Sequence, residues 1–277
     1  MQNHYSKTST ILFRVLVCIL LVITLFPIYW IINTSFKGSL EVVSPIPTFF
    51  PHKPTLENFT NVLTSGFWGN LLNSLIVTVC ATLLSLVLAY CSSYALVRHN
   101  FPLKFNLVFL IWILIVKVLP PVVLAIPLYM MLNFFKLINH LSALIIVYQV
   151  YTLPYCIWMI FGFLKAVPKE YEEAALIDGA SRSYILFRIV MPLVRAGLIA
   201  TSIFAAITAW DEFLFALLFI RTPAKLTLPL VIVNYIGEYE TLWGELMAIG
   251  LFTAIPMLLF TNFVYKYYTQ GFSMNLK

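Results

Sequence analysis

Long apolar stretches separated by short polar segments are the dominant pattern of this 277-residue chain. The hydrocarbon core of a bilayer is about 30 Å thick, and about 20 apolar residues in a helix cross it. The stretches are continuous and do not alternate with a period of two, which favours helices over a membrane barrel. The pattern predicts an all-α, polytopic membrane protein forming a single transmembrane domain over 1–277. Its six transmembrane helices are expected at about 15–32, 71–97, 105–131, 142–164, 196–220 and 246–265.

Proline and length refine two of these helices. Pro120 and Pro121 lie inside the third predicted span, where the missing N–H and the ring should kink the helix and free backbone carbonyls. The first span is longer than the apolar region of a signal peptide, and no small-x-small cleavage site follows Trp30-Ile31-Ile32. We therefore expect the first span to remain in the protein as a membrane helix.

Composition agrees with a membrane environment and argues against several kinds of site. The chain is 61% hydrophobic and 10% charged, whereas soluble domains are about 25% charged. Too few polar side chains exist to cover this apolar surface, so much of it must face lipid. The net charge of +6 is accordingly no nucleic-acid footprint. The cysteines form no CxxC pair and the histidines lack metal-ligand spacing, so we expect no metal site.

The distribution of Lys and Arg predicts the orientation, because these residues collect in cytoplasmic loops. With the N-terminus inside, eleven fall on the cytoplasmic side: Lys7, Arg14, Arg98, Lys104, Lys165, Lys169, Arg182, Arg188, Arg195, Lys266 and Lys277. Five fall on the outer side: Lys37, Lys53, Lys136, Arg221 and Lys225. We therefore expect both termini in the cytoplasm.

Two segments on the predicted outer side, 33–70 and 221–245, are long and rich in aromatic side chains. The second also carries acids among its aromatic residues: Tyr235, Glu238, Tyr239, Glu240, Trp243 and Glu245. Loops on a rigid scaffold often carry binding function. The sequence leaves open whether these segments contact an external partner or are passive connectors.

One polar segment, Lys165 to Arg195, differs from the rest of the chain. Pro168 suits the first turn of a helix. Three acids follow it, where the N-terminus of a helix attracts negative charge: Glu170, Glu172 and Glu173. The segment therefore predicts a helix that begins shortly after Pro168.

The same segment contains signals for a turn and a second helix. Gly179 can adopt a left-handed conformation and end the first helix. Ser181 or Ser183 can cap the next one. The expected structure is helix, tight turn, helix on the cytoplasmic face. The residues alone leave two interpretations open, an amphipathic helix held by lipid headgroups or a projection that fits a groove in a partner protein.

A spacing pattern within the segment bears on that choice. Glu173-Ala174-Ala175 is followed by Asp178-Gly179-Ala180 and then by Ile189-Val190-Met191-Pro192. This resembles the EAA loop of permease subunits of ATP-binding-cassette (ABC) importers, which usually reads EAA, three residues, G, nine residues and I-x-L-P. Met191 stands where Leu is common.

The resemblance covers nearly the whole chain and is closest to the carbohydrate-importer branch, related to the smaller maltose-permease subunit. Further matching pieces are Leu25-Phe26-Pro27, Ser93-Tyr94-Ala95-Leu96-Val97-Arg98, Ala209-Trp210-Asp211-Glu212-Phe213 and Thr227-Leu228-Pro229. It implies a type I ABC importer permease fold in a bacterial inner membrane. It also implies that the chain forms half of a translocation pathway for a sugar or oligosaccharide, with a non-sugar polar solute as the alternative.

The resemblance further implies that the loop docks in a cleft of a separate ATPase. The residues carried over to this contact are Glu172, Glu173, Ala174, Ala175, Asp178, Gly179, Ala180, Ile189 and Pro192. The implied partners are a second permease in a heterodimer, an ATPase dimer on the cytoplasmic face and an extracytoplasmic solute-binding protein, with lipid around the helices.

The sequence independently lacks a G-x-x-x-x-G-K-[ST] motif, so the chain has no phosphate-binding loop of its own. We therefore expect it to be no enzyme and to bind no cofactor, with ATP and Mg held on the partner ATPase. An ion-coupled secondary transporter would need intramembrane carboxylates in both halves of the chain. The first half has none.

Three charged residues fall within predicted spans: Lys117, Asp211 and Glu212. A charge there costs about 2.5–3.5 kcal/mol on insertion scales and usually faces a cavity or a partner. We hypothesise that Lys117 pairs with one of the two acids, or with an acid of the partner permease. Asp211 stands where the family often has Asn or Gly, and Lys117 where it usually has an uncharged residue or an amide.

Three residues suit contact with a hydroxyl-rich ligand, because aromatic faces and amides bind such molecules: Tyr129, Asn133 and Trp210. Ordinary helix packing is the alternative role for each of them.

Overall fold

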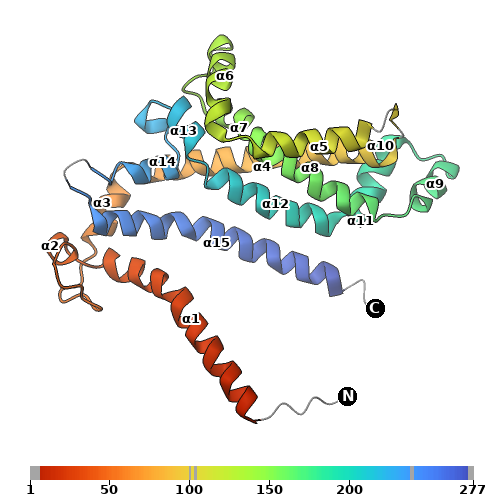
Figure 1. The fold of residues 1–277 in the computed structure, drawn as a ribbon. Helices are drawn as coiled ribbons and strands as arrows, with labels where there is room; N and C mark the ends of the chain where they lie inside the picture. The colour runs from red at the N-terminus through yellow and green to blue at the C-terminus, as the bar shows by residue number, and fades with distance from the viewer. Residues whose placement is uncertain (1–6, 100, 103–104, 238–239, 274–277) are drawn as a thin grey trace. The chain divides into compact units, whose positions relative to one another are not determined.

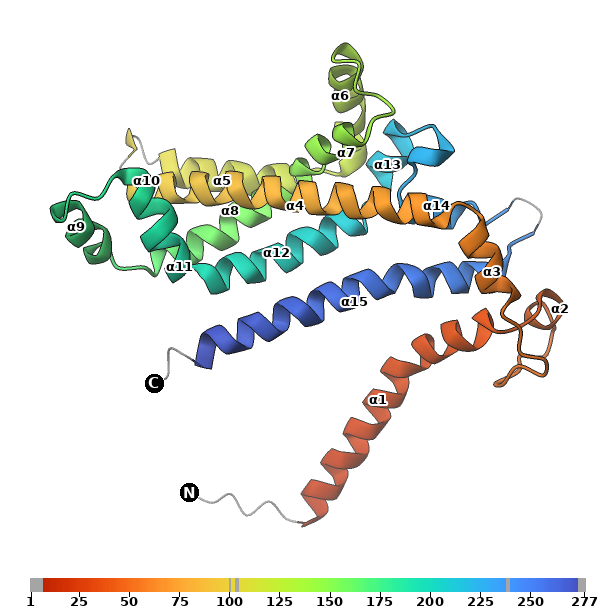
Figure 2. The ribbon, with the colours of Figure 1, turned by 180° about the vertical axis from the view of Figure 1, so that it is seen from behind.

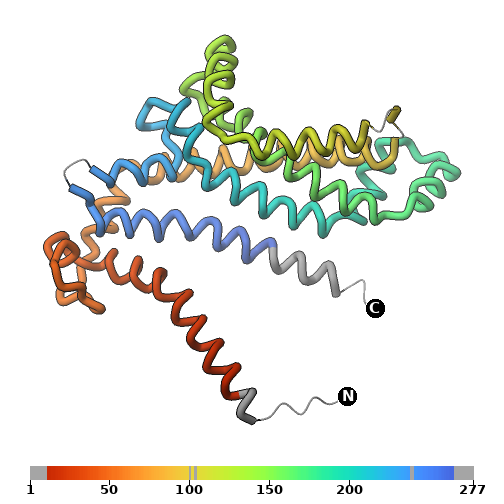
Figure 3. The backbone as a smooth tube through the Cα atoms, viewed as in Figure 1, coloured from red at the N-terminus to blue at the C-terminus, as the bar shows by residue number. Residues whose placement is uncertain are grey.

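The protein, seen here as a computed structural model, is helical over the described residues, with one isolated antiparallel bridge between Ile236 and Thr241 (Figures 1 and 2). The description covers residues 7–99, 101–102, 105–237 and 240–273, without the side chains of 7–10 and 265–273, and Figure 3 shows the remainder in grey. Six residues assigned from the sequence to one side of the membrane or the other therefore lie outside the described residues or side chains: Lys7, Lys104, Glu238, Tyr239, Lys266 and Lys277.

The described chain divides into two compact units. The first unit combines the residues up to Phe67 with Ile232–Ile255, and the second combines Trp68–Val231 with the residues from Pro256 onward. The elements of the first unit are α1 (Lys7–Ser35), α2 (Ser39–Val42), α3 (Glu57–Thr64) and the beginning of α15 (Trp243–Ser273).

The first unit joins a membrane helix to a folded segment. The most apolar part of α1 is unburied within the chain, as expected for a helix that faces lipid or another subunit. Its C-terminal end is fixed by Asn58, whose Nδ2 donates to the carbonyl oxygens of Ser35 (2.9 Å) and Lys37 (2.8 Å). Helix ends leave such carbonyls unpaired, so Asn58 ties α3 to the end of α1.

The second unit carries most of the helices. They are α4 (Phe67–Arg98), α5 (Phe105–Val118), α6 (Pro121–Phe134), α7 (Leu141–Val147), α8 (Gln149–Lys165), α9 (Glu170–Ile177), α10 (Arg182–Tyr184), the π-helical turn η2 (Ile185–Val190), α11 (Met191–Leu193), α12 (Arg195–Trp210), α13 (Leu214–Phe219), the 3₁₀ turn η3 (Pro223–Lys225) and α14 (Leu228–Val233). Helix α8 packs against both α5 and α12 (Figures 1 and 2). The core of this packing includes Ile160 and Leu164 of α8, which are fully buried.

The third predicted span is kinked at the expected proline pair, and the bend is large. Helix α5 ends at Val118, and α6 begins at Pro121 with an axis turned by 98°. Pro121 occupies the first turn of α6, where its fixed φ is favourable and its missing N–H breaks no hydrogen bond. The prediction of a kink is confirmed, whereas a straight helix over 105–131 is not found.

The fifth predicted span also differs from expectation, because the helix expected over 196–220 ends at Trp210. Helix α13 follows after a break at Asp211–Phe213. The carboxylate of Glu212 accepts hydrogen bonds from the backbone N–H groups of Phe215 (2.8 Å) and Ala216 (3.2 Å). These are donors that a helix N-terminus leaves unpaired. Hydropathy gives no sign of this break, since both flanks are apolar.

The described residues include four helices long and apolar enough to cross a membrane, or up to six if each bent pair forms one span. One bent pair is α5 with α6, and the other joins Arg182–Leu193 to α12 at 79°. The upper number equals the six predicted spans, but its second bent pair includes Arg182–Leu193, which was predicted to lie in the cytoplasmic segment and not in a span.

Candidate functional site

The segment Lys165 to Arg195, called here the EAA segment, folds as helix, turn, helix as predicted. Helix α9 has its three acids in the first turn and ends at Ile177. Gly179 follows with φ +81°, and the N–H of Ala180 donates to the carbonyl of Ala175 (2.9 Å). This left-handed glycine closes the C-terminus of α9, since L-residues with a side chain adopt that conformation only with strain.

The second half of the EAA segment begins at a serine cap. The Ser181 hydroxyl accepts from the N–H of Tyr184 (3.3 Å), so of the two candidate caps Ser181 fills the position. The chain continues through η2, whose residues Ile185 and Val190 are fully buried. The Tyr90 hydroxyl of α4 donates to the carbonyl of Leu186 (2.6 Å). The second half is therefore fixed to α4 by packing and by a hydrogen bond.

The two faces of α9 differ in chemistry. Glu172 and Ala175 are 5% and 9% exposed and face the core of the second unit. Four other predicted docking residues lie exposed in this segment: Glu173, Ala174, Asp178 and Gly179. Tyr171 and Ile177 are also exposed, at 55% and 87%. An exposed face combining apolar, small and acidic side chains is typical of a surface that another protein covers.

An ion pair fixes the inward face of α9. The Arg98 guanidinium, at the end of α4, donates through Nε to Glu172 Oε1 (2.5 Å) and through Nη2 to the carbonyl of Val167 (2.9 Å). The Tyr94 hydroxyl donates to Glu172 Oε2 (2.7 Å). The sequence grouped Glu172 with the docking residues, whereas the structure gives its carboxylate two intramolecular partners. Arg98 was named from the sequence among the cations expected on the cytoplasmic side and within a matching piece of the resemblance, but no partner was predicted for it.

The remaining predicted docking residues lie along the second half of the segment. Ala180 and Ile189 are half-buried and pack against the core around Leu164, while Pro192 is exposed. Of these three residues, Pro192 is therefore the most accessible to a partner protein.

The intramembrane charges do not pair with one another within the described residues. Lys117 lies in the last turn of α5, where a cation interacts favourably with the helix C-terminus, and its Nζ lies 5.1 Å from the centroid of the Tyr155 ring. Glu212 serves as the cap of α13, and Asp211 is exposed at the end of α12. The hypothesis that Lys117 pairs with Asp211 or Glu212 is therefore wrong for this chain alone.

The three residues expected to contact a hydroxyl-rich ligand fall in two places. On α6, the Tyr129 hydroxyl accepts from Arg221 Nη2 (2.9 Å), and Asn133 is exposed. Trp210 is 4% exposed and lines a cavity of about 290 Å³ with Thr78 and Thr82. Most of the lining is apolar. Among the hydrogen bonds and ring contacts of the described residues, none joins Trp210 to the other two.

A cluster of polar contacts around Asn139, linked to Tyr129 through Arg221, was not predicted from the sequence. Asn139, in the left-handed region with φ 65°, accepts through Oδ1 from the N–H groups of Arg221 and Thr222 (3.1 Å each). The Lys225 ammonium donates to the carbonyl of Asn139 (2.9 Å). The sequence signal that could have located these contacts is Asn139 itself, because it lies between two apolar runs and Asn tolerates positive φ.

Comparison with known proteins identifies the family to which this arrangement belongs. The family model described as the binding-protein-dependent transport system inner membrane component matches residues 81–274, which include Arg98 and the whole EAA segment. The chain belongs to this family. It is therefore a membrane-spanning transport subunit and no enzyme, and the ATPase of such a system is a separate chain.

Individual relatives of this transport component cover most of its length. The diacetylchitobiose uptake system permease protein DasC of Streptomyces coelicolor is 38% identical over 241 residues, covering 87% of this chain and 86% of that protein. The sulfoquinovosyl glycerol transport system permease protein SmoH of Agrobacterium fabrum is 39% identical over 241 residues, covering 86% and 84%. Both names describe permease proteins of uptake or transport systems, in agreement with the resemblance carried by the EAA segment.

The fold is likewise shared with a solved transporter. A chain in the crystal structure of a bacterial ABC transporter involved in the import of the acidic polysaccharide alginate aligns with a TM-score of 0.80 at 22% identity. The alignment covers 96% of this chain and 99% of that chain. The transport component described here therefore has the type I ABC importer permease fold.

Proposed function

We propose that this permease carries a carbohydrate across the membrane and that its EAA segment docks the ATPase that drives transport. The carbohydrate assignment is supported by relatives whose names specify diacetylchitobiose and sulfoquinovosyl glycerol as transported molecules. The chain supplies one half of the translocation pathway, and a second permease supplies the other. An external binding protein delivers the solute, and ATP with Mg is bound on the ATPase dimer.

One observation carries the coupling role. Helix α9 is held from inside by the buried Glu172 carboxylate, while Glu173 and Ala174 remain exposed. A helix fixed on one face and free on the other moves as a rigid body with its support. When the ATPase pair rearranges on ATP binding, a displacement of α9 is transmitted through Arg98 to α4. The small Ala174 permits close approach, and the Glu173 carboxylate is positioned to meet a basic side chain of the ATPase.

Charge distribution supports the orientation. The described cations Arg98, Lys165, Lys169 and Arg182 all lie at or beside the EAA segment, and Lys or Arg residues collect on the cytoplasmic side. We place the EAA segment and both termini in the cytoplasm. The segments 33–70 and 221–245 then face outward, where the binding protein approaches.

Uptake by the reconstituted transporter tests this function. The permease is co-purified with its ATPase and second permease, inserted into liposomes with ATP inside, and supplied with binding protein and radiolabelled sugars. Glu173→Lys and Gly179→Pro should abolish ATP-driven uptake while leaving the permease in the membrane. Glu57→Lys is the matched charge reversal on the exposed N-terminus of α3, and it should leave the yield of co-purified ATPase unchanged.

Three results would contradict the proposal in different ways. Normal uptake in both EAA variants would overturn the coupling role. Uptake that persists without ATP would favour an ion-coupled secondary transporter. Uptake of a non-sugar polar solute, with no competition from a panel of sugars, would overturn the carbohydrate assignment and leave the coupling role standing.

A further inference from the structure

The first unit contains a cavity of about 330 Å³ that the transport role does not explain. It lies between the end of α1, α2, the following loop and the first turns of α15. Six of its lining residues carry the chemistry: Trp30, Thr34, Lys37, Glu41, Thr48 and Trp243. Its volume is at the lower end of the range of about 300–1,000 Å³ found for small-molecule sites.

Lys37 is a buried cation in the wall of this cavity. The residue is 3% exposed, its Nζ donates to the carbonyl of Thr48 (2.5 Å), and it lies 5.0 Å from the centroid of the Trp30 ring. The ion pairs of the described residues do not include Lys37, so no described carboxylate lies within 4.0 Å of it. An ammonium has three donors, and buried donors are normally satisfied. Lys37 therefore has capacity to donate into the cavity.

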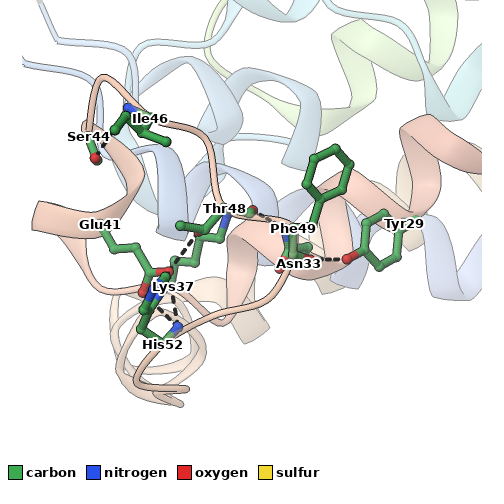
Figure 4. A network of polar contacts seen from close by, with 9 residues as sticks. All are labelled: Tyr29, Asn33, Lys37, Glu41, Ser44, Ile46, Thr48, Phe49 and His52. Atoms are coloured by element: carbon green, nitrogen blue, oxygen red, sulfur yellow. Dashed lines mark hydrogen bonds and ion pairs between the residues drawn. The ribbon is translucent and has the colours of Figure 1, made fainter.

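A carboxylate and, among the described residues, a hydroxyl without a partner also line this cavity. Glu41 Oε1 accepts from the Thr48 hydroxyl (2.7 Å) and from the N–H of His52 (3.1 Å), as Figure 4 shows. These hydrogen bonds lower the pKa of Glu41 to about 2, so its carboxylate is ionised and available as an acceptor. Thr34 is only 6% exposed, and its hydroxyl has no hydrogen-bond partner among the residues that the structure describes.

Two indole rings, Trp30 and Trp243, complete the lining. The face of an aromatic ring is electron-rich and attracts the weakly positive C–H groups of an apolar surface. A pyranose ring presents such C–H groups on its faces and hydroxyl groups around its edge. Those hydroxyls accept from an ammonium and donate to a carboxylate. The charges of Lys37 and Glu41 offset each other, which favours a neutral polyhydroxylated ligand over an anion.

We propose that this cavity is a binding subsite for one neutral sugar ring, with Lys37, Glu41 and Thr34 contacting its hydroxyls and the tryptophans contacting its faces. The subsite rests on the proposed function, because the sugar it takes is part of the transported carbohydrate. It adds a place within the permease where that carbohydrate is recognised after leaving the binding protein.

Binding of simple glycosides to the intact transporter tests the subsite. The full permease–ATPase complex is placed in lipid nanodiscs without binding protein, and saturation-transfer NMR is recorded with methyl glucoside and methyl N-acetylglucosaminide. Inorganic phosphate and glycerol 3-phosphate serve as probes of an anion or lipid-headgroup site. Thr34→Val removes only the unpartnered hydroxyl, and Trp243→Leu removes one ring. Thr60→Val on α3 and Trp158→Leu on α8 are matched controls at exposed positions.

We expect the glycosides to bind the wild-type complex. Their affinity should fall about fivefold in Thr34→Val, as expected for loss of one hydrogen bond, and at least as much in Trp243→Leu. The two controls should bind as the wild type does. If Trp243→Leu fails to assemble, Thr34→Val decides alone, since it changes no packing volume of consequence.

Two outcomes overturn the subsite. Equal glycoside affinity in the wild type and Thr34→Val shows that the sugar does not contact this cavity. Binding of the phosphate probes alone shows an anion site. ATP-driven sugar uptake is measured on the same preparations. If uptake is normal in both variants and the glycosides bind no differently, only the subsite fails. If no sugar is transported by the wild type, the proposed function itself fails.

Discussion

Arg98 and Glu172, 74 residues apart in the chain, form an ion pair at the base of α9 with side chains that are 12% and 7% exposed. The pair is reinforced by the Tyr94 hydroxyl on the carboxylate and by the Val167 carbonyl on the guanidinium. Desolvating two charges is costly, and the cost is offset only when further hydrogen bonds satisfy them. This network meets that condition, so it fixes α9 to the end of α4.

Removing one partner should be worse than removing both. Arg98→Met leaves the Glu172 carboxylate buried without a cation, which typically destabilises by about 3–5 kcal/mol. We expect this variant to lose most of the co-purifying ATPase and most of its uptake. The double variant Arg98→Met with Glu172→Leu should recover thermal stability relative to the single variant, since a buried apolar pair is often tolerated.

Thermal unfolding in detergent, the yield of co-purified ATPase and uptake in liposomes measure these effects. Arg14→Met, at an exposed position of α1, is the matched control and should behave as the wild type does. Equal stability of Arg98→Met and the wild type would show that the ion pair does not hold α9. A double variant that is stable yet transports poorly would show that the charges are also needed for coupling.

The left-handed turn at Gly179 gives a second prediction. A Cβ added at Gly179 or at Gly162 meets no atom within 4 Å, but only Gly179 has a positive φ, of +81°. The left-handed conformation costs an L-residue about 1–2 kcal/mol. Gly179→Ala should therefore lower thermal stability and ATPase yield, whereas Gly162→Ala should not. Gly179→Asn should lie between Gly179→Ala and the wild type, because Asn tolerates this region. Equal effects at the two glycines would refute a role for backbone conformation.

Local rules explain why much of the fold and of the EAA segment could be predicted from sequence. Hydropathy located the apolar helices, the fixed φ of proline located the bend at Pro120, and the preferences of glycine and serine located the turn at Gly179 and the cap at Ser181. Each of these features depends on a few neighbouring residues. The start and end of α9 could therefore be placed before any tertiary contact was known.

Features that depend on distant partners could not be predicted in this way. The resemblance to the EAA loop assigned Glu172 to the docking contact, and an acid at a helix N-terminus is favourable in whichever direction it points. Only the position of Arg98 turns that carboxylate inward. The break at Asp211–Phe213 escaped hydropathy because Glu212 satisfies the backbone of α13 without changing the apolar character of either flank. The sequence thus shows that a charged residue is present, whereas the contacts of its side chain depend on how the chain folds around it.

Lys117 provides a third prediction, because it lies over the Tyr155 ring and has no carboxylate partner among the described side chains. Cation–π contacts contribute about 0.5–2 kcal/mol. A double-mutant cycle with Lys117→Met and Tyr155→Leu should give a coupling energy in that range. The cycle of Lys117→Met with Glu212→Gln should give a coupling energy near zero. Chemical unfolding in mild detergent supplies the free energies. A coupling larger with Glu212 than with Tyr155 would restore the carboxylate pair expected from the sequence.

The Glu41 carboxylate gives a prediction about pH. The Thr48 hydroxyl and the His52 backbone N–H lower its pKa from 4.5 to about 2, with the His52 ring 3.2 Å away and Lys37 in the same network (Figure 4). Because the folded pKa lies below the ordinary value, the stabilisation is present above pH 4.5 and is lost as the pH falls toward 2.

The carboxyl resonance of Glu41 in ¹³C-glutamate-labelled protein, assigned by its disappearance in Glu41→Gln, should titrate with a midpoint well below 4.5. Thr48→Val removes the largest cause and should move that midpoint upward. A midpoint at 4.5 in both proteins would mean that the hydrogen bonds to Glu41 do not form, and the cavity would then lack its fixed acceptor.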